Sequence, residues 1–318
     1  MENLFNLIEK VFLVFILTSP LIAQKRSFFD KTYELIAKSI YVPVEWFDNF
    51  FTDERIIEEE PTSKLRWITD FRFEQGGKFY LRTFVHINVR LPKASKKLKL
   101  IIEREEESGE QKTQTQIQTT TLSQEEKLKR SKIGFRYSVF YNIINSLQFA
   151  AGTKTGIPPK LYLRSRYRLN MPFTKTMLGR FSIKALWLRG EGWEEKVNLD
   201  FEKLFSKRIM LRWGSVGLFD LPKNSFNWDS SITYRFQFSP RSAFSCNFGF
   251  WGTKQDIFSV EGYRILPRYK STIFRRWIFW EISPGVMWFR EGASFKRVFA
   301  TVFRFEIQFN RKFINKNE

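Results

Sequence analysis

The sequence predicts an all-β fold in which a meander of antiparallel strands closes into a barrel, preceded by a short helical segment. Three observations lead to this prediction. From Lys64 onward apolar and polar residues alternate over most of the chain, turn residues recur between the alternating runs, and 18% of the 318 residues are aromatic. Because successive strand side chains point to opposite faces, each run has one apolar and one polar face. A transmembrane barrel places the first against lipid and the second around its interior.

The last alternating run, Ser294 to Phe309, shows this pattern most clearly. Its even positions include Lys296, Arg304, Glu306 and Gln308. The apolar residues at odd positions are Phe295, Phe299, Phe303, Phe305, Ile307 and Phe309. So many phenylalanines on one strand face are typical of a strand that borders hydrocarbon.

The remaining runs recur at a spacing that suits a series of hairpins. The expected strands lie at residues 65–73, 79–91, 98–102, 133–141, 147–153, 161–169, 181–187, 197–201, 209–213, 228–238, 244–250, 257–266, 278–288 and 294–309. The count is about fourteen, and twelve or sixteen remain possible because the run at 257–266 is ambiguous in phase. An even number returns the end of the barrel to the side on which it began.

The chain divides into four parts on this reasoning. Residues 1–23 resemble a secretory signal peptide, with an apolar run after Lys10 and a small residue, Ala23, at the expected cleavage edge. Residues 24–63 form a periplasmic helical segment, the barrel occupies 64–309, and 310–318 form a tail.

Two segments outside the strands have distinctive compositions. The helical segment carries apolar residues at helical spacing and then the acidic run from Asp53 to Glu60. It is open whether this segment is a plug, a membrane-surface helix, an arm that binds a partner, or a helix packed on the barrel mouth. The polar, Thr/Gln-rich stretch from Glu103 to Arg130 is expected to be a loop on the external side.

The formal net charge of +20 is compatible with a solvated basic surface, with nucleic-acid binding, with an anionic membrane surface or with a pore that attracts anions. Nucleic-acid binding is disfavoured, because the aromatic residues lie on the strand faces opposite the arginines, where stacking and phosphate contact cannot combine. A soluble β-sandwich is also disfavoured. Trp and Tyr cluster near strand ends, as an aromatic girdle at a membrane interface requires. These are Trp67, Tyr80, Trp187, Trp193, Trp213, Trp228, Trp251, Tyr263 and Trp277.

The candidate functional residues are those expected to line the interior of the barrel. They are Arg66, Arg72, Arg82, His86, Arg90, Arg136, Arg164, Arg166, Arg168, Arg212, Arg235 and Arg304. These side chains either bridge to carboxylates and stiffen the wall, or make a cationic lumen that attracts anions.

Catalytic, cofactor and metal sites are not predicted. The only histidine, His86, shares a strand face with Arg82 and Arg90, and no catalytic triad can be assembled around it from the spacing. The only cysteine, Cys246, falls on an apolar face and behaves as a small hydrophobic residue. One histidine, one cysteine and scattered carboxylates give no cluster of metal ligands. The chain is therefore not expected to be an enzyme.

The signal-like start, the hairpin meander and the aromatic last strand resemble Gram-negative outer-membrane β-barrel proteins. Phe305-x-Ile307-x-Phe309 is similar to the C-terminal signal by which such barrels are recognised for assembly, although nine residues, Asn310 to Glu318, follow it here. The segment Trp46 to Arg55 followed by Arg-rich strands looks like that of an uncharacterised group of these proteins. The resemblance implies an outer-membrane location, contact with outer-membrane lipid and with the barrel-assembly machinery, and no particular functional residues.

The function expected on these grounds is a porin-like channel for small anionic solutes. The alternative is a structural or adhesion barrel in the outer membrane that does not conduct.

Overall fold

The computed structural model describes Val44, Trp46, Phe47, Phe50 and Phe51, and residues 64–90, 98–104, 131–141, 144–154, 159–222, 224–254, 258–275 and 277–310. The predicted signal peptide at 1–23, the apolar residues expected to form a helix before Pro43, the loop at 105–130 and the tail after Asn310 lie outside the described residues.

Fourteen β-strands make up the described part of the chain beyond residue 63, and each expected strand is present. Their bounds are β1 Lys64–Glu74, β2 Lys78–Arg90, β3 Leu98–Arg104, β4 Ser131–Tyr141, β5 Asn145–Lys154, β6 Lys160–Thr174, β7 Met177–Leu188, β8 Gly192–Ser206, β9 Ile209–Asp220, β10 Ser225–Ser239, β11 Ser242–Lys254, β12 Phe258–Thr272, β13 Ile278–Glu291 and β14 Ser294–Asn310. The strand expected at 257–266 is longer than predicted, because β12 continues through Pro267 to Thr272.

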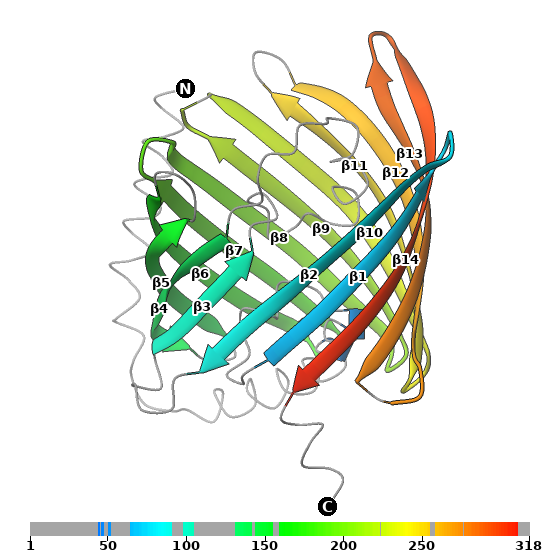
Figure 1. Ribbon diagram of the computed structural model, residues 1–318, viewed down its shortest axis with the longest axis horizontal. Helices are drawn as coiled ribbons and strands as arrows, with labels where there is room; N and C mark the ends of the chain where they lie inside the picture. The colour runs from blue at the N-terminus through cyan, green and yellow to red at the C-terminus, as the bar shows by residue number, and fades with distance from the viewer. Residues whose placement is uncertain are drawn as a thin grey trace, which may run out of the picture.

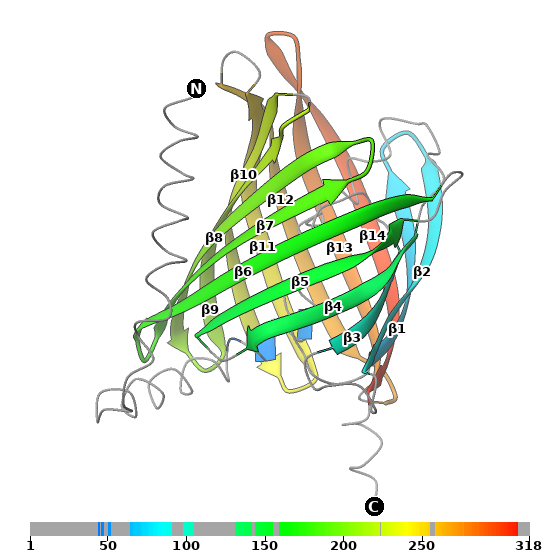
Figure 2. The same ribbon diagram turned by 90° about the vertical axis from the view of Figure 1, so that its left-hand side faces the viewer.

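Each strand pairs antiparallel with its neighbours in sequence, and β1 also pairs with β14, so that the sheet closes into a barrel. The seam between the first and last strands runs from Lys64 opposite Asn310 to Glu74 opposite Ala300. Figures 1 and 2 show the tilted strands around the barrel, with β1 beside β14. This closure pairs the backbone groups of the first strand with those of the last, whereas β2 pairs with the short β3 only over Ile87–Arg90.

The barrel has two different ends. At the terminal end, β1 begins and β14 ends, and the links β6–β7, β8–β9, β10–β11 and β12–β13 are found there. At the opposite end, here called the loop end, β1 ends and β2 begins, and β3 ends and β4 begins. In the tight turn between β1 and β2, Gly76 and Gly77 have φ values of 88° and 76°, a region that favours glycine.

The burial of side chains is the reverse of that in a soluble protein. Outward-facing apolar residues are exposed, as shown by Leu81 at 60% and Phe149 at 48%, whereas inward-facing Arg136 and Arg212 are each only 2% exposed. Apolar residues are normally the most buried and arginine is almost never fully buried unless paired. Among the described residues, exposed rings therefore lie on the outer face and buried arginines on the inner face, which is the opposite of the arrangement in a soluble sandwich.

Two residues of the expected aromatic girdle lie on the inner face instead. Tyr80 is directly opposite Arg72 across the β1–β2 pair, on the polar side of the strand. Trp251 precedes a register shift in β11, is opposite Asp229, and has the guanidinium carbon of Arg264 6.0 Å from its ring. The girdle was predicted from proximity to a strand end, but the alternation along the strand decides whether a side chain faces lipid or the interior. The polar tips of Tyr and Trp also suit a polar interior.

Strands β4 and β5 approach closely where Gly134 lies opposite Gly152. A β-carbon added to Gly152 would lie 2.1 Å from the carbonyl oxygen of Ile133 and 2.5 Å from the α-carbon of Gly134. Both contacts are with backbone atoms, which cannot rotate away as a side chain can. Glycine at this position therefore allows the two strands to pair at their observed register.

We expect Gly152→Ala to destabilise the refolded protein by about 1–3 kcal/mol, the usual cost of forcing an extra carbon into a packed site. Urea unfolding followed by tryptophan fluorescence would measure the loss. Thr153→Ala is the matched control on the exposed face of the same strand, and should change stability by less than about 0.5 kcal/mol. Equal stability of the Gly152→Ala variant and the parent would contradict this account of the β4–β5 pairing.

Candidate functional site: the barrel interior

The period of two places most of the predicted interior residues on the inner face of the wall. Those that are at most 9% exposed are Arg66, Arg72, Arg136, Arg164, Arg166, Arg168, Arg212 and Arg235. Arg82 is half-buried opposite Asp70, and Arg304 lies on the inner face of β14. His86 and Arg90 belong to β2, in a stretch whose side chains lie outside the described part of the structure.

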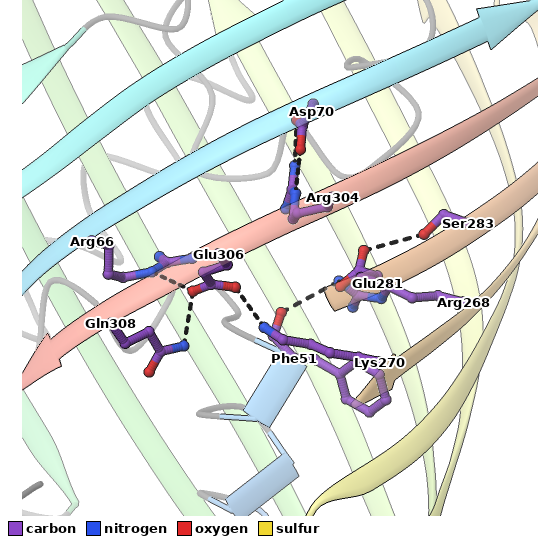
Figure 3. A network of polar contacts seen from close by, with 10 residues as sticks. All are labelled: Phe51, Arg66, Asp70, Arg268, Lys270, Glu281, Ser283, Arg304, Glu306 and Gln308. Atoms are coloured by element: carbon purple, nitrogen blue, oxygen red, sulfur yellow. Dashed lines mark hydrogen bonds and ion pairs between the residues drawn. The ribbon is translucent and has the colours of Figure 1, made fainter. Parts of the chain in front are cut away.

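An ion-pair network crosses the seam that closes the barrel (Figure 3). The Arg304 guanidinium donates from Nε and Nη2 to the two carboxylate oxygens of Asp70, at 2.7 and 2.8 Å. This two-point contact joins β14 to β1. Bidentate pairing of a guanidinium with a carboxylate is among the strongest polar contacts in proteins, and it fixes both side chains in one geometry.

Glu306 is the centre of the same network. Its Oε1 accepts from Arg66 Nε at 2.8 Å and from Gln308 Nε2 at 2.8 Å, and its Oε2 accepts from Lys270 Nζ at 2.6 Å. The carboxylate therefore links β1 and β12 across β14. Since Glu306 is only 1% exposed and Lys270 is fully buried, the pairing compensates the cost of removing these charges from water.

Glu281 extends the network along β13. It accepts a hydrogen bond from Ser283 Oγ at 3.1 Å and pairs with Arg268 Nη1 at 3.5 Å (Figure 3).

Two further groups of charges brace the other side of the interior. Arg264 of β12 pairs with Asp229 of β10 and donates from Nε to the amide oxygen of Asn247 at 2.7 Å. Glu202 of β8 pairs with Arg212 of β9 at 2.5 Å and with Arg180 of β7 at 3.4 Å. Basic side chains and carboxylates of different strands are thus joined across the inner face of the wall.

Charge is distributed unequally around the wall. Strands β4 to β7 contain no Asp or Glu. Their inner positions carry Arg136, Lys154, Lys160, Arg164, Arg166, Arg168, Arg180 and Lys184. On β13, β14 and β1, in contrast, inward carboxylates are buried, namely Asp70, Glu74, Glu281 and Glu306. A cationic wall, defined as β4 to β7, therefore adjoins strands in which charges of both signs are paired.

At the loop end the cationic wall is tied to the next hairpin through Glu191 in the β7–β8 turn. Lys160 donates to its Oε1 at 2.7 Å, and Lys154 lies 3.6 Å from its Oε2. The hydrogen bond from Lys160, helped by the charge of Lys154, lowers the pKa of the Glu191 carboxyl below its usual value. The pairing therefore contributes most above the ordinary glutamate pKa, and it is lost as the pH falls through the lowered value.

An apolar cluster occupies the interior near the terminal end. Its wall part, here called the collar, consists of the inward-facing residues Leu178, Leu204, Met210, Ala243 and Phe279, all at most 5% exposed. Its other part, here called the plug, consists of the described residues of the N-terminal segment, Val44, Trp46, Phe47, Phe50 and Phe51, which are helical. The short blue segment within the barrel in Figure 2 is this plug.

The plug is fixed by ring stacking and by two arginines of the wall. Phe50 stacks with Trp46 at 4.8 Å between ring centroids and meets Phe279 edge-on at 5.9 Å. The guanidinium carbons of Arg268 and Arg235 lie 4.6 and 5.4 Å from the centre of the Phe51 ring. Arg268 also donates to the carbonyl oxygen of Phe51 at 3.3 Å (Figure 3). Cations over a ring face are attracted by its quadrupole, most strongly where water is excluded.

The list of interior residues predicted from sequence omits several members of this site. Asp229, Arg268, Lys270 and Glu281 were left out, and the last three are on β12 and β13, where an ambiguous phase and Pro284 obscured the alternation. The collar was also missed. In the sequence, a collar residue is recognisable as an apolar residue beside a turn, at a position where the alternation predicts a polar one. Phe279, between Ile278 and Trp280, is an example.

Metal and helix-spanning features are not found in the described part of the chain. No group of three or more His, Cys, Asp or Glu side chains there is arranged to hold a metal ion. Among the same residues no helix has the length and apolar character needed to cross a membrane.

Comparison with known proteins gives structural likeness without sequence relationship. No family model matches the chain, and no curated protein matches its sequence. The outer-membrane channel DcaP of Acinetobacter baumannii matches with a TM-score of 0.45 and 8% identity, over 78% of this chain and 96% of that one. OprB of Pseudomonas putida matches with a TM-score of 0.44 and 7% identity, over 82% and 97%. OpdO of Pseudomonas aeruginosa matches with a TM-score of 0.43 and 8% identity, over 79% and 96%. Sequence identities of 7–8% and TM-scores below 0.5 carry no argument about function, which has to come from the geometry of this chain.

We expect Asp70→Asn to destabilise the barrel by about 3–5 kcal/mol, because it leaves the Arg304 guanidinium buried without its counter-charge. Adding Arg304→Gln should recover a large part of this loss, since the remaining pair is neutral. A double-mutant cycle by urea unfolding measures the coupling between the two sites. Additive single effects would show that the seam does not depend on this pair.

Proposed function

We propose that this protein is an outer-membrane β-barrel that acts as a porin-like channel for small anionic solutes. The observation that supports it best is the inverted burial of a closed sheet, with exposed rings outside and ion-paired arginines inside. Hydrocarbon offers no hydrogen bonds, so only helices and closed barrels satisfy every backbone group within it. The described strands form one closed order in which each strand pairs with two neighbours, and they present an apolar outer surface.

Outer-membrane lipid is therefore the proposed partner of the outer face, and the barrel-assembly machinery the proposed partner of the last strand. The even strand count, with both ends of the sheet at the same end of the barrel, suits a single-chain bacterial barrel. The predicted signal peptide, cleaved near Ala23, fits export and remains a proposal. Nucleic-acid binding and catalysis are not part of this proposal.

The preference for anions is supported by the cationic wall of β4 to β7. Arg164, Arg166 and Arg168 form a row on one strand, and these four strands supply no carboxylate to neutralise it. Rings or rows of Arg and Lys in a lumen favour anionic permeants. The field of the cationic wall would draw anions along that side of the interior.

A non-conducting structural or adhesion barrel is the second candidate, and the degree of burial favours it. Interior arginines are at most 9% exposed over much of the wall, and the plug fills part of the terminal end. Fourteen strands lie between the roughly eight that side chains can fill and the 16–18 that leave an aqueous channel. Conductance in a planar bilayer, measured on the refolded protein and on a variant lacking the rings of the described N-terminal residues, decides between the two candidates.

Membrane insertion predicts opposite outcomes for two adjacent residues of β5. Phe149→Glu places a charge on the outer face and should destabilise the protein in bilayers by about 1–3 kcal/mol, somewhat less than a basic residue would at the midplane. Gln148→Glu places the same charge inside, opposite Arg166, and should be nearly neutral. Folding into vesicles, scored by heat-modifiable gel migration, measures both. A tolerated Phe149→Glu together with a damaging Gln148→Glu would contradict a lipid-facing outer surface.

Ion selectivity tests the role of the cationic wall. Replacing Arg164, Arg166 and Arg168 together by Gln should shift the reversal potential in a salt gradient toward weaker anion preference. Lys296→Gln is a suitable control, because this exposed lysine pairs with Glu291 at the rim. The measurement is made on the parent chain and on a variant lacking the plug rings. A cation preference in the parent, or an unchanged reversal potential in the triple variant, would contradict the proposed anion pathway.

A further inference from the structure

The collar departs from the rule that governs the rest of the inner wall. Elsewhere inward positions are mostly charged or polar, with apolar exceptions that include the smaller cluster around Leu186 and Leu188. At one end of the barrel, however, five strands each bring an inward apolar residue into a single cluster. Each lies within two residues of a strand end at the terminal end of the barrel: Leu178 in β7, Leu204 in β8, Met210 in β9, Ala243 in β11 and Phe279 in β13. An apolar band inside a polar lumen is unfavourable unless something apolar covers it.

The plug packs against this band in one buried cluster. Val44 and Phe47 are fully buried, Phe51 is 1% exposed and Phe50 7%. These residues come from the N-terminal segment, which precedes the wall in the chain. The inner surface at this level is therefore complementary to a segment of the same chain.

The two arginines that hold Phe51 lie on β10 and β12, outside the cationic wall of β4 to β7, but they face the same interior. Arg268 contacts the ring and the carbonyl oxygen of Phe51, and it also pairs with Glu281. Arg235 lies over the same ring. While the plug is in place these guanidinium groups face an aromatic ring and a peptide carbonyl. Withdrawal of Phe51 exposes both guanidinium groups to the lumen, where Arg268 keeps its contact with Glu281.

We propose that the plug is an autoinhibitory closure of the barrel at its terminal end, and that solute passage requires the plug to leave the collar. This inference rests on the proposed channel function. Closure is held by apolar burial against the collar and by the cation–ring contacts of Arg235 and Arg268. An anion that reaches these arginines competes with Phe51 for them, so that the plug and the solute share one set of contacts.

Removing the rings that seal the collar tests the closure. In the variant Phe47→Ala, Phe51→Ala, the open fraction in planar-bilayer recordings should rise by roughly a hundredfold, about tenfold for each buried ring removed. Because neither ring belongs to a strand, the barrel should still form, and heat-modifiable migration verifies this. Phe248→Ala is the matched control, a ring of the outer face, and should leave the open fraction unchanged.

A disulfide lock tests the same contact in the opposite direction. With Cys246→Ser as background, Phe50→Cys and Phe279→Cys introduce two thiols at neighbouring sites of plug and collar. Oxidation should abolish openings and reduction should restore them, whereas Phe50→Cys alone should not respond. If the cross-link forms in the folded barrel and openings persist, the plug does not close the barrel and the inference is overturned.

The outcomes separate this inference from the proposed function. A closed parent and an open ring-deficient variant support both. A parent that conducts as well as the variant overturns the closure and leaves the channel intact. If the folded variant is also silent while the disulfide forms, the plug occupies the collar but the barrel is not a channel, and the closure has nothing to regulate.

Discussion

The whole structure depends on one constraint, the alternation of side chains in a sheet that closes on itself. Once β1 pairs with β14, every second residue of every strand must enter a shared interior. In this chain those residues are largely charged, so the interior has to satisfy charges in a confined space. The exposed rings outside and the ion pairs inside are two consequences of the same alternation.

The confined charges explain why the pairing is so specific. An unpaired buried charge is costly, and a pair is tolerated only with good geometry and additional hydrogen bonds. Glu306 meets this condition with three donors from three strands, and Asp70 meets it with two of the three nitrogens of the Arg304 guanidinium. These contacts lie at the seam and beside it, where the first and last strands meet and a correct register is needed for closure. The ion pairs that satisfy the charges of the interior therefore also hold the first and last strands together.

The strands and the face on which most arginines lie were predictable from sequence, because a period of two depends only on neighbouring residues. The partners of those arginines were not predictable. Arg304 follows Val302 and precedes Glu306 in the same strand row, yet its partner is Asp70, 234 residues earlier in the chain. The pairing depends on the register of β1 against β14, which no local pattern contains. The collar could not be predicted for a similar reason. Each of its apolar residues is isolated in the sequence, and only the packing of five strands brings them together at one level of the barrel.

The plug follows from the width of the barrel. A wall of fourteen strands encloses more space than a layer of side chains fills, but less than the open lumen of a larger porin. On one side the seam network occupies this space, and near the terminal end the plug does. A segment that enters from the N-terminal side can fill the remaining volume without altering the register of any strand. Because its contacts are rings against a collar and arginines over a ring face, it can be withdrawn without breaking the hydrogen bonds of the wall. Closure of the lumen and integrity of the barrel are thus held by separate interactions.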